Sequence, residues 1–219
     1  MIAQRMKELL NTGVVLDKET GEYRPVHYRD MVILTRSLQG WAEVFASILA
    51  EEGIPAYSVS REGYFETYEV SVLLDYLKVL DNARQDLPLT AVLTSPFAGL
   101  TAAELSVIRL AYPNQLFYEA AEGFCSLSPE EIPETVDKKQ AIQVQEKLRK
   151  FFEVLDHFRE ILPYTAIHDL LAEIIDKTGY GLFISAMPGG AQRQANVEML
   201  VEKARAFEGT SYKGLFNFV

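Results

Sequence analysis

Residues 141–158 read AIQVQEKLRKFFEVLDHF and form the most regular stretch of the sequence. The apolar side chains recur every three or four residues, which places them on one face of an α-helix. We predict one long amphipathic helix here, closed by Pro163. Its apolar positions are Ala141, Val144, Leu148, Phe151, Phe152, Leu155 and Phe158.

The same period recurs on both sides of this helix. It appears at Val70, Leu73, Leu74, Leu77 and Leu80, at Ile167, Leu170, Leu171, Ile174 and Ile175, and at Val197, Leu200, Val201, Ala204 and Phe207. Thr101-Ala-Ala-Glu104 is a capping box, in which two side chains bond the free N–H groups of a helix start. Ser128-Pro-Glu-Glu131 has the same form, and Pro133 limits its length. The sequence predicts a mainly α protein, all-helical over residues 84–219.

Strand signals are confined to the first sixty residues. Residues 13–26 resemble a hairpin with a glycine-containing loop. Met31-Val-Ile-Leu34 is a short apolar run typical of a buried parallel strand, and residues 54–59 supply a second strand. Between them, helical spacing joins Trp41, Val44, Phe45, Ile48 and Leu49. We therefore predict a parallel strand-helix-strand unit over residues 30–60, within a small α/β part that spans residues 1–83.

Composition is that of an ordinary globular protein: 219 residues, 48% hydrophobic and 24% charged. Cys125 is the single cysteine, which excludes an internal disulfide and suggests a reducing compartment. The sequence has neither a signal peptide nor a membrane-spanning run, so we expect a cytoplasmic protein. The chain opens within a predicted helix and closes about two turns after Ser211, where another begins. This pattern predicts an internal fragment of a longer protein.

The net charge of −10 disfavours free-standing, non-specific DNA binding, because an acidic surface repels phosphates unless positive charge gathers locally. Small basic groups do occur among acidic neighbours on predicted helices. We interpret them as solvated helix faces. They are Lys147, Arg149 and Lys150, then Arg193, Lys203 and Arg205.

No self-contained active site is predicted. The sequence lacks the GxxxxGK[ST] loop that cradles nucleotide phosphates, and Gly179-Tyr-Gly181 is better explained as the end of a helix. The three histidines, His27, His157 and His168, are far apart in sequence, and no HExxH spacing exists. Cys125 has no histidine nearby in sequence, so a buried thiol is expected. We predict no catalytic, cofactor-binding or metal-binding residue.

Two segments carry features that folding alone does not explain. Arg36 and Ser37 directly follow the predicted strand at 31–34, at the sheet edge where α/β proteins bind ligands. They are candidates for a contact with the DNA backbone, and an ion pair of Arg36 with a neighbouring acid is the alternative. The second segment is a Pro-Gly-Gly turn at 188–190 that leads into a helix. Gln192, Arg193 and Asn196 in its first turns suit an anion or a partner's carbonyls. The alternative is a structural turn in which Arg193 and Asn196 tie this helix to its neighbours.

The sequence resembles the UvrD-like superfamily 1 DNA helicases, specifically the A subunit of the bacterial AddAB-type helicase-nuclease, over almost the whole chain. The resemblance is carried by Tyr28-Arg-Asp-Met-Val-Ile-Leu-Thr-Arg-Ser37, Gly63-Tyr-Phe-Glu-Thr-Tyr-Glu-Val70, Leu77-Lys-Val-Leu-Asp-Asn82 with Asp86 and Ser95-Pro96, and Met187-Pro-Gly-Gly-Ala-Gln-Arg-Gln-Ala-Asn196. In that family a strand-end arginine and a Gly-x-x-Phe segment belong to the second RecA-like motor domain. The resemblance implies that residues 1–83 are part of that domain and that residues 84–219 are the helical subdomain inserted in it.

Leu38 and Thr67 stand where many members have an asparagine and an arginine that approach DNA, so those contacts are not carried over. The ATP-binding loop, the Mg²⁺-binding acids and the nuclease of the family match no residue of this chain.

The resemblance implies a non-catalytic fragment of an ATP-dependent DNA helicase/exonuclease subunit that acts in double-strand-break repair and recombination. The fragment would guide or couple DNA movement, with ATP and Mg²⁺ bound elsewhere in the parent protein. DNA and an AddB-type nuclease subunit would be the partners, and Arg36, Ser37, Gln192, Arg193 and Asn196 the DNA-facing residues. The alternative is a protein-protein interaction module that packs against the nuclease subunit.

Overall fold

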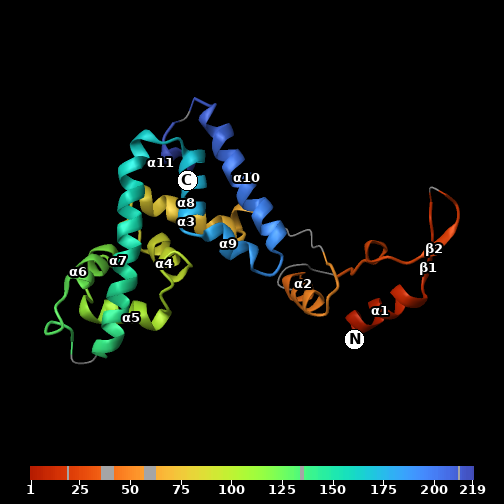
Figure 1. Ribbon diagram of the computed structural model, residues 1–219, viewed down its shortest axis with the longest axis horizontal. Helices are drawn as coiled ribbons and strands as arrows, with labels where there is room; N and C mark the ends of the chain where they lie inside the picture. The colour runs from red at the N-terminus through yellow and green to blue at the C-terminus, as the bar shows by residue number, and fades with distance from the viewer. Residues whose placement is uncertain (19, 36–41, 57–62, 134–135, 212) are drawn as a thin grey trace. The chain divides into compact units, whose positions relative to one another are not determined.

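Helices make up most of the chain (Figure 1). The computed structural model describes residues 1–18, 20–35, 42–56, 63–133, 136–211 and 213–219. Contacts divide the chain into two compact units, Met1–Gly63 (unit 1) and Tyr64–Val219 (unit 2). In the described residues, the two strands of unit 1 form a single small sheet. The predicted mainly α class is confirmed.

Unit 1 begins with helix α1 (Ile2–Thr12) and a hairpin of strands β1 (Val14–Leu16) and β2 (Tyr23–Pro25). The strands are antiparallel, with Val15 opposite Arg24, which confirms the predicted hairpin. Arg24 fixes the chain after β2, because its guanidinium donates to both Asp30 carboxylate oxygens at 2.7 and 2.8 Å. A short 3-10 helix (Tyr28–Asp30) and helix α2 (Ala42–Glu51) follow.

The structure corrects one part of the predicted strand-helix-strand unit. Helix α2 is present, but residues 31–35 and 54–56 form no strand. Val32 and Leu34 are 76% and 87% exposed. A parallel strand needs a neighbour that accepts its backbone hydrogen bonds, and the described part of unit 1 offers none beyond β1 and β2. Residues 57–59 of the second predicted strand lie outside the described ranges.

Unit 2 is all-helical in its described residues. After the 3-10 turn Tyr64–Glu66 come α3 (Tyr68–Asp81), α4 (Asp86–Thr94), α5 (Ala102–Ala111), α6 (Phe117–Ser126), α7 (Lys138–Ile161), the 3-10 turn Leu162–Tyr164, α8 (Ile167–Lys177), α9 (Tyr180–Ser185), α10 (Gly190–Glu208) and α11 (Leu215–Phe218). Helix α3 lies between α7 and α10 and packs against both (Figure 1).

One continuous core fills unit 2 and uses the apolar faces that the sequence predicts. Helix α7 buries Ala141, Val144, Leu148, Phe151, Leu155 and Phe158, with Phe152 half-buried beside them. Helix α8 buries Ile167, Leu170, Leu171 and Ile174. The capping box is also present, since Glu104 N donates to Thr101 Oγ1 at 3.2 Å and Thr101 N donates to Glu104 Oε2 at 2.7 Å.

The contact-based division of the chain differs from the predicted boundary near Arg84. Helix α3 belongs to unit 2, because Val70, Leu73 and Leu77 are fully buried in the same core as α4, α7 and α10. Ser128 begins a turn and not a helix; Glu131 accepts its N–H at 2.9 Å, but no helical hydrogen bonds continue through Pro133. Across the described ranges, no helix is long and apolar enough to cross a membrane.

Candidate functional site

The Pro188-Gly189-Gly190 turn connects α9 to α10 and sets where α10 begins. Gly189 has φ +73°, a left-handed backbone conformation that residues other than glycine rarely adopt. At Gly190, a Cβ atom would overlap the Ser185 carbonyl oxygen. The two glycines are therefore required for different reasons, one by its backbone angle and the other by a close approach to α9.

Two of the predicted site residues on α10 meet at Glu69, in the first turn of α3. Arg193 NH1 donates to Glu69 Oε2 at 2.5 Å, and Asn196 Nδ2 donates to Glu69 Oε1 at 2.6 Å. The Glu69 side chain is only 3% exposed. Both of its oxygens are thus occupied by donors from α10, 124 and 127 residues away in sequence.

Two tyrosine hydroxyls complete this cluster. Tyr64 donates to the Asn196 carbonyl oxygen at 2.6 Å, and the buried Tyr180 donates to the Glu69 carbonyl oxygen at 3.0 Å. Arg193 Nε also donates to the Pro188 carbonyl oxygen at 3.1 Å, which joins the cluster to the turn. We call Glu69, Arg193, Asn196, Tyr64 and Tyr180 the Glu69 network.

The electrostatics of Glu69 favour its charged form. Burial by itself raises the pKa of this carboxyl, but the hydrogen bond from Asn196 and the charge and hydrogen bond of Arg193 outweigh burial and hold the pKa below its usual value. Glu69 is therefore ionised at neutral pH. A buried carboxylate that is fully paired is stable only while both partners stay in place.

Sequence reasoning missed Glu69, Tyr64 and Tyr180 as members of this cluster. One signal was present: Glu69 shares a helical face with Leu73 and Tyr76, at spacings of four and seven residues, and both are buried. A charged residue on an apolar stripe requires a buried partner. The sequence does not say which cation supplies it.

The predicted site residues are thus only partly brought together. Gln192 is exposed, and its Nε2 donates to Asn196 Oδ1 at 3.1 Å. Arg193 and Asn196 tie α10 to α3, as the structural alternative for this turn expected. Arg36 and Ser37 lie outside the described residues. A contact of any of these five residues with DNA stays a prediction.

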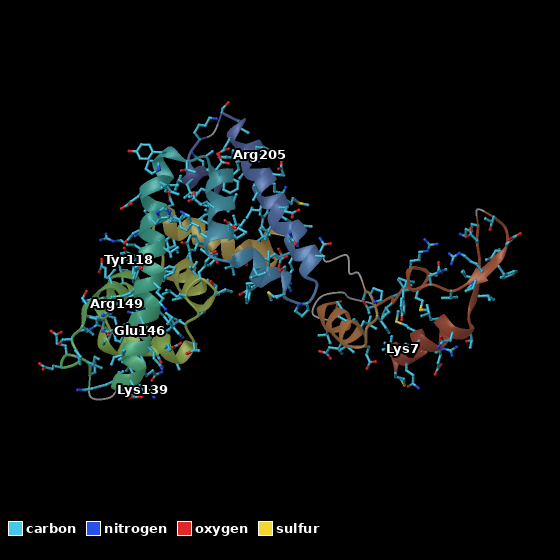
Figure 2. All side chains as sticks on the ribbon, in the orientation of Figure 1. Lys7, Tyr118, Lys139, Glu146, Arg149 and Arg205 are labelled. Carbon is cyan, nitrogen blue, oxygen red and sulfur yellow. The ribbon has the colours of Figure 1, made fainter. Side chains whose placement is uncertain are left out.

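Four other basic side chains of the predicted groups contact residues of their own or a neighbouring segment of unit 2. Lys147 Nζ lies 2.7 Å from Glu104 Oε1, and Arg205 on α10 lies 2.6 Å from Glu202. Arg149, labelled on α7 in Figure 2, donates across to α6 at the Cys125 carbonyl oxygen, 3.1 Å away. Lys203 Nζ lies 5.3 Å from the centre of the Tyr64 ring. These contacts agree with the prediction that the basic groups lie on ordinary helix surfaces. They do not bring several positive charges together at one place, as a phosphate-binding site would require.

The surroundings of His168 and Cys125 indicate a role in folding and not in catalysis. His168 Nδ1 lies 2.5 Å from Glu208 Oε2, and Glu208 Oε1 accepts the Ile167 N–H that opens α8. Burial raises the pKa of the Cys125 thiol to about 11. Within the described part of the chain, no group of three or more His, Cys, Asp or Glu side chains is placed to hold a metal ion.

Comparison with known proteins gives the family. Residues 2–213 match the UvrD-like helicase C-terminal domain. The chain is 40% identical over its whole length to the A subunit of the ATP-dependent helicase/nuclease of Lachnoclostridium phytofermentans, and 41% identical to that of Heliobacterium modesticaldum. The corresponding protein of Bacillus cytotoxicus is 40% identical, again over the whole chain. The chain spans 19%, 16% and 17% of these three relatives, respectively. It therefore belongs to the UvrD-like helicase C-terminal domain family.

Proposed function

We propose that this chain is a non-catalytic segment of an ATP-dependent DNA helicase/nuclease subunit, where it guides or couples DNA movement during double-strand-break repair and recombination. The observation that carries the proposal is full-length similarity, at about 40% identity, to A subunits of ATP-dependent helicase/nucleases, of which the chain covers less than a fifth. The segment would then function only as part of the complete subunit.

ATP and Mg²⁺ would act elsewhere in the subunit. The chain has no GxxxxGK[ST] loop, and its described residues offer no carboxylate cluster for a metal ion. These residues do not fit either group, so we assign no step of ATP hydrolysis to them. A cytoplasmic location and a partner nuclease subunit of the AddB type belong to the same proposal.

Unit 1 would belong to the second RecA-like motor domain. The apolar side chains of Val32 and Leu34 are mostly exposed, and of the described side chains of unit 1 only Leu49 and Ile54 are buried. Such a segment buries too little apolar surface to be stable by itself. The missing neighbours would be the other strands of a parallel sheet, against which residues 31–34 would pair.

Arg36 and Ser37 would contact the DNA backbone at the edge of that sheet. The test is Arg36→Ala in the complete subunit, with Arg29→Ala as a control that removes the same charge seven positions earlier. We expect DNA-stimulated ATP hydrolysis to fall about tenfold or more for Arg36→Ala, since a charge-assisted phosphate contact contributes about 1.5–3 kcal/mol. Equal rates for both variants at low and high salt would remove Arg36 from the DNA-binding surface.

A specific observation also favours a second function, a protein-protein interaction module. Leu182 and Phe183 on α9 are 79% and 40% exposed, and residues 178–192 carry no charged side chain. Titration of the isolated chain with DNA at several salt concentrations separates the two functions. Phosphate contacts give an affinity that falls steeply with salt, whereas an interaction module does not bind DNA even at low salt.

A further inference from the structure

The Glu69 network lies where the chain enters unit 2. Residues 64–69 follow directly on Gly63, the last residue of unit 1, and lead into α3. Within these six residues, the Tyr64 hydroxyl and the Glu69 carboxylate both bond to Asn196. Lys203, two turns further along α10, has its Nζ 5.3 Å from the centre of the Tyr64 ring and 5.7 Å from that of Phe65. The first residues of unit 2 are therefore attached to α10 over about three turns of that helix.

Attachment through a buried carboxylate is all-or-none. The Glu69 side chain is 3% exposed while α10 packs on α3, and a shift of α10 removes both of its donors at once. An unpaired buried charge is far more costly than a broken apolar contact, which weakens gradually with distance. Residues 64–69 and the start of α10 thus stay together until the whole network opens.

Arg193 extends this attachment to the turn before α10. Its NH1 donates to the Glu69 carboxylate, while its Nε donates to the Pro188 carbonyl oxygen at 3.1 Å. The turn also lies close to the end of α9, because a Cβ atom at Gly190 would overlap the Ser185 carbonyl oxygen. The position of Glu69 therefore determines the position of the turn and of the exposed end of α9.

We propose that Glu69 is a positioning residue that makes residues 64–69, the Pro188–Gly190 turn and the first turns of α10 move as one body. Movement of the segment that follows unit 1 is thereby transmitted to the exposed, uncharged surface at α9 and the turn. This inference rests on the proposed function, and it adds the residues through which motor movement would reach the helical unit.

The first test measures hydrogen exchange in this chain. Glu69→Gln keeps the shape of the side chain but removes its charge, and Glu202→Gln makes the same change at an exposed pair on α10. We expect amides 193–197 to exchange about fivefold faster or more in Glu69→Gln, measured relative to the amides of α7. Glu202→Gln should match the wild type. Unchanged exchange at 193–197 in Glu69→Gln overturns the inference.

Tyr64→Phe provides a milder variant in case Glu69→Gln does not fold. It deletes only the hydroxyl that bonds to the Asn196 carbonyl oxygen. A smaller increase in exchange, confined to the same amides, supports the inference. An increase spread evenly over unit 2 contradicts it, because the network would then stabilise the fold without holding α10 in particular.

The second test measures, in the complete subunit, the number of base pairs unwound per ATP hydrolysed. A merely structural role leaves this ratio unchanged, whereas loss of transmission lowers it by about fivefold or more while ATP hydrolysis continues. We expect the lower ratio for Glu69→Gln and a normal ratio for Glu202→Gln. A normal ratio in both variants overturns transmission through Glu69. A wild-type subunit that hydrolyses no ATP overturns the proposed function instead, and the exchange experiment still decides whether Glu69 holds α10.

Discussion

Glu69 on α3 and Arg193 on α10, 124 residues apart in sequence, form an ion pair of 2.5 Å between Oε2 and NH1. The carboxylate is almost fully buried, and Asn196 occupies its other oxygen at 2.6 Å. Removing one partner of such a pair leaves the other unsatisfied, which costs more than the pair itself contributes. The consequences can be measured in this chain.

Glu69→Ala should lower the free energy of unfolding by about 3–5 kcal/mol, because Arg193 and Asn196 lose their acceptor. The measurement is urea denaturation followed by circular dichroism. Glu202→Ala on α10 is the matched control, and its exposed pair should contribute less than about 1 kcal/mol. The double variant Glu69→Ala with Arg193→Met should recover part of the loss. If both alanine variants lowered the free energy of unfolding equally, burial of the Glu69 pair would make no difference to its contribution.

The Tyr76 and Tyr180 hydroxyls provide a matched comparison. Both tyrosines are 1% exposed, but Tyr180 donates to the Glu69 carbonyl oxygen at 3.0 Å, whereas the Tyr76 hydroxyl has no hydrogen bond to a described residue. We expect Tyr180→Phe to destabilise unit 2 by about 1 kcal/mol, and Tyr76→Phe to be neutral or stabilising. Urea midpoints would decide, and a larger loss for Tyr76→Phe would contradict the assignment of these contacts.

Stability should fall with acid partly through Glu104. Burial by itself raises the pKa of this carboxyl, but the hydrogen bonds from Lys147 and Thr101 outweigh burial and hold the pKa below its usual value. The unfolded chain then binds more protons than the native one as pH falls toward and below the ordinary carboxyl pKa, so the contribution present above that pKa is lost on acidification. Glu104→Gln should be less stable than wild type at neutral pH and should show a shallower loss on acidification. Parallel pH profiles would contradict this.

Cys125 should react slowly with alkylating reagents at neutral pH. Burial raises the pKa of its thiol to about 11, so the thiolate, which is the reactive form, is scarce. The alkylation rate of the folded chain should keep rising up to pH values near that pKa. The urea-unfolded chain, with an ordinary thiol pKa of about 8.5, is the control and should level off earlier. Identical pH profiles would show that the thiol is not shielded.

Residues 31–34 should change their hydrogen exchange with context. In the isolated chain these amides have no strand partner among the described residues, and those of residues 32–34 should exchange rapidly. The Met31 amide is left out of the comparison, because it donates to the Tyr28 carbonyl oxygen at 3.1 Å. In the complete subunit, pairing within a parallel sheet would slow the amides of residues 32–34 about a hundredfold or more. The amides of β1 and β2 are the control, because these strands pair with each other inside the chain and should do so in both samples. Rapid exchange at 32–34 in both samples would contradict the proposal that unit 1 belongs to a RecA-like domain.

Much of the helical fold follows from the sequence because its signals are local. The apolar stripe from Ala141 to Phe158 repeats within single turns, and the structure buries it as predicted. The Thr101–Glu104 capping box needs only residues three apart, so it is also present as predicted. The hairpin around Gly21 is local in the same sense.

The errors arise where a local signal needs a distant partner. Met31-Val-Ile-Leu34 has the composition of a buried strand, but composition does not provide the neighbouring strand that its backbone requires. The turn at Ser128 has a different and local cause, because Pro133 follows its capping motif after only five residues. The domain boundary near Arg84 stays a prediction of the resemblance; the buried residues of helix α3 pack in the contact-defined unit 2.

The sequence by itself determined the helical class, the buried faces of the main helices and the likeness to UvrD-like helicases, since each depends on residue order within short segments. Only the tertiary structure showed that Arg193 and Asn196 meet at Glu69. Side-chain spacing fixes which face of a helix is apolar, but it does not determine which residue of another helix lies opposite a buried charge. That choice depends on how α3 and α10 pack, and the packing is decided by the whole core of unit 2.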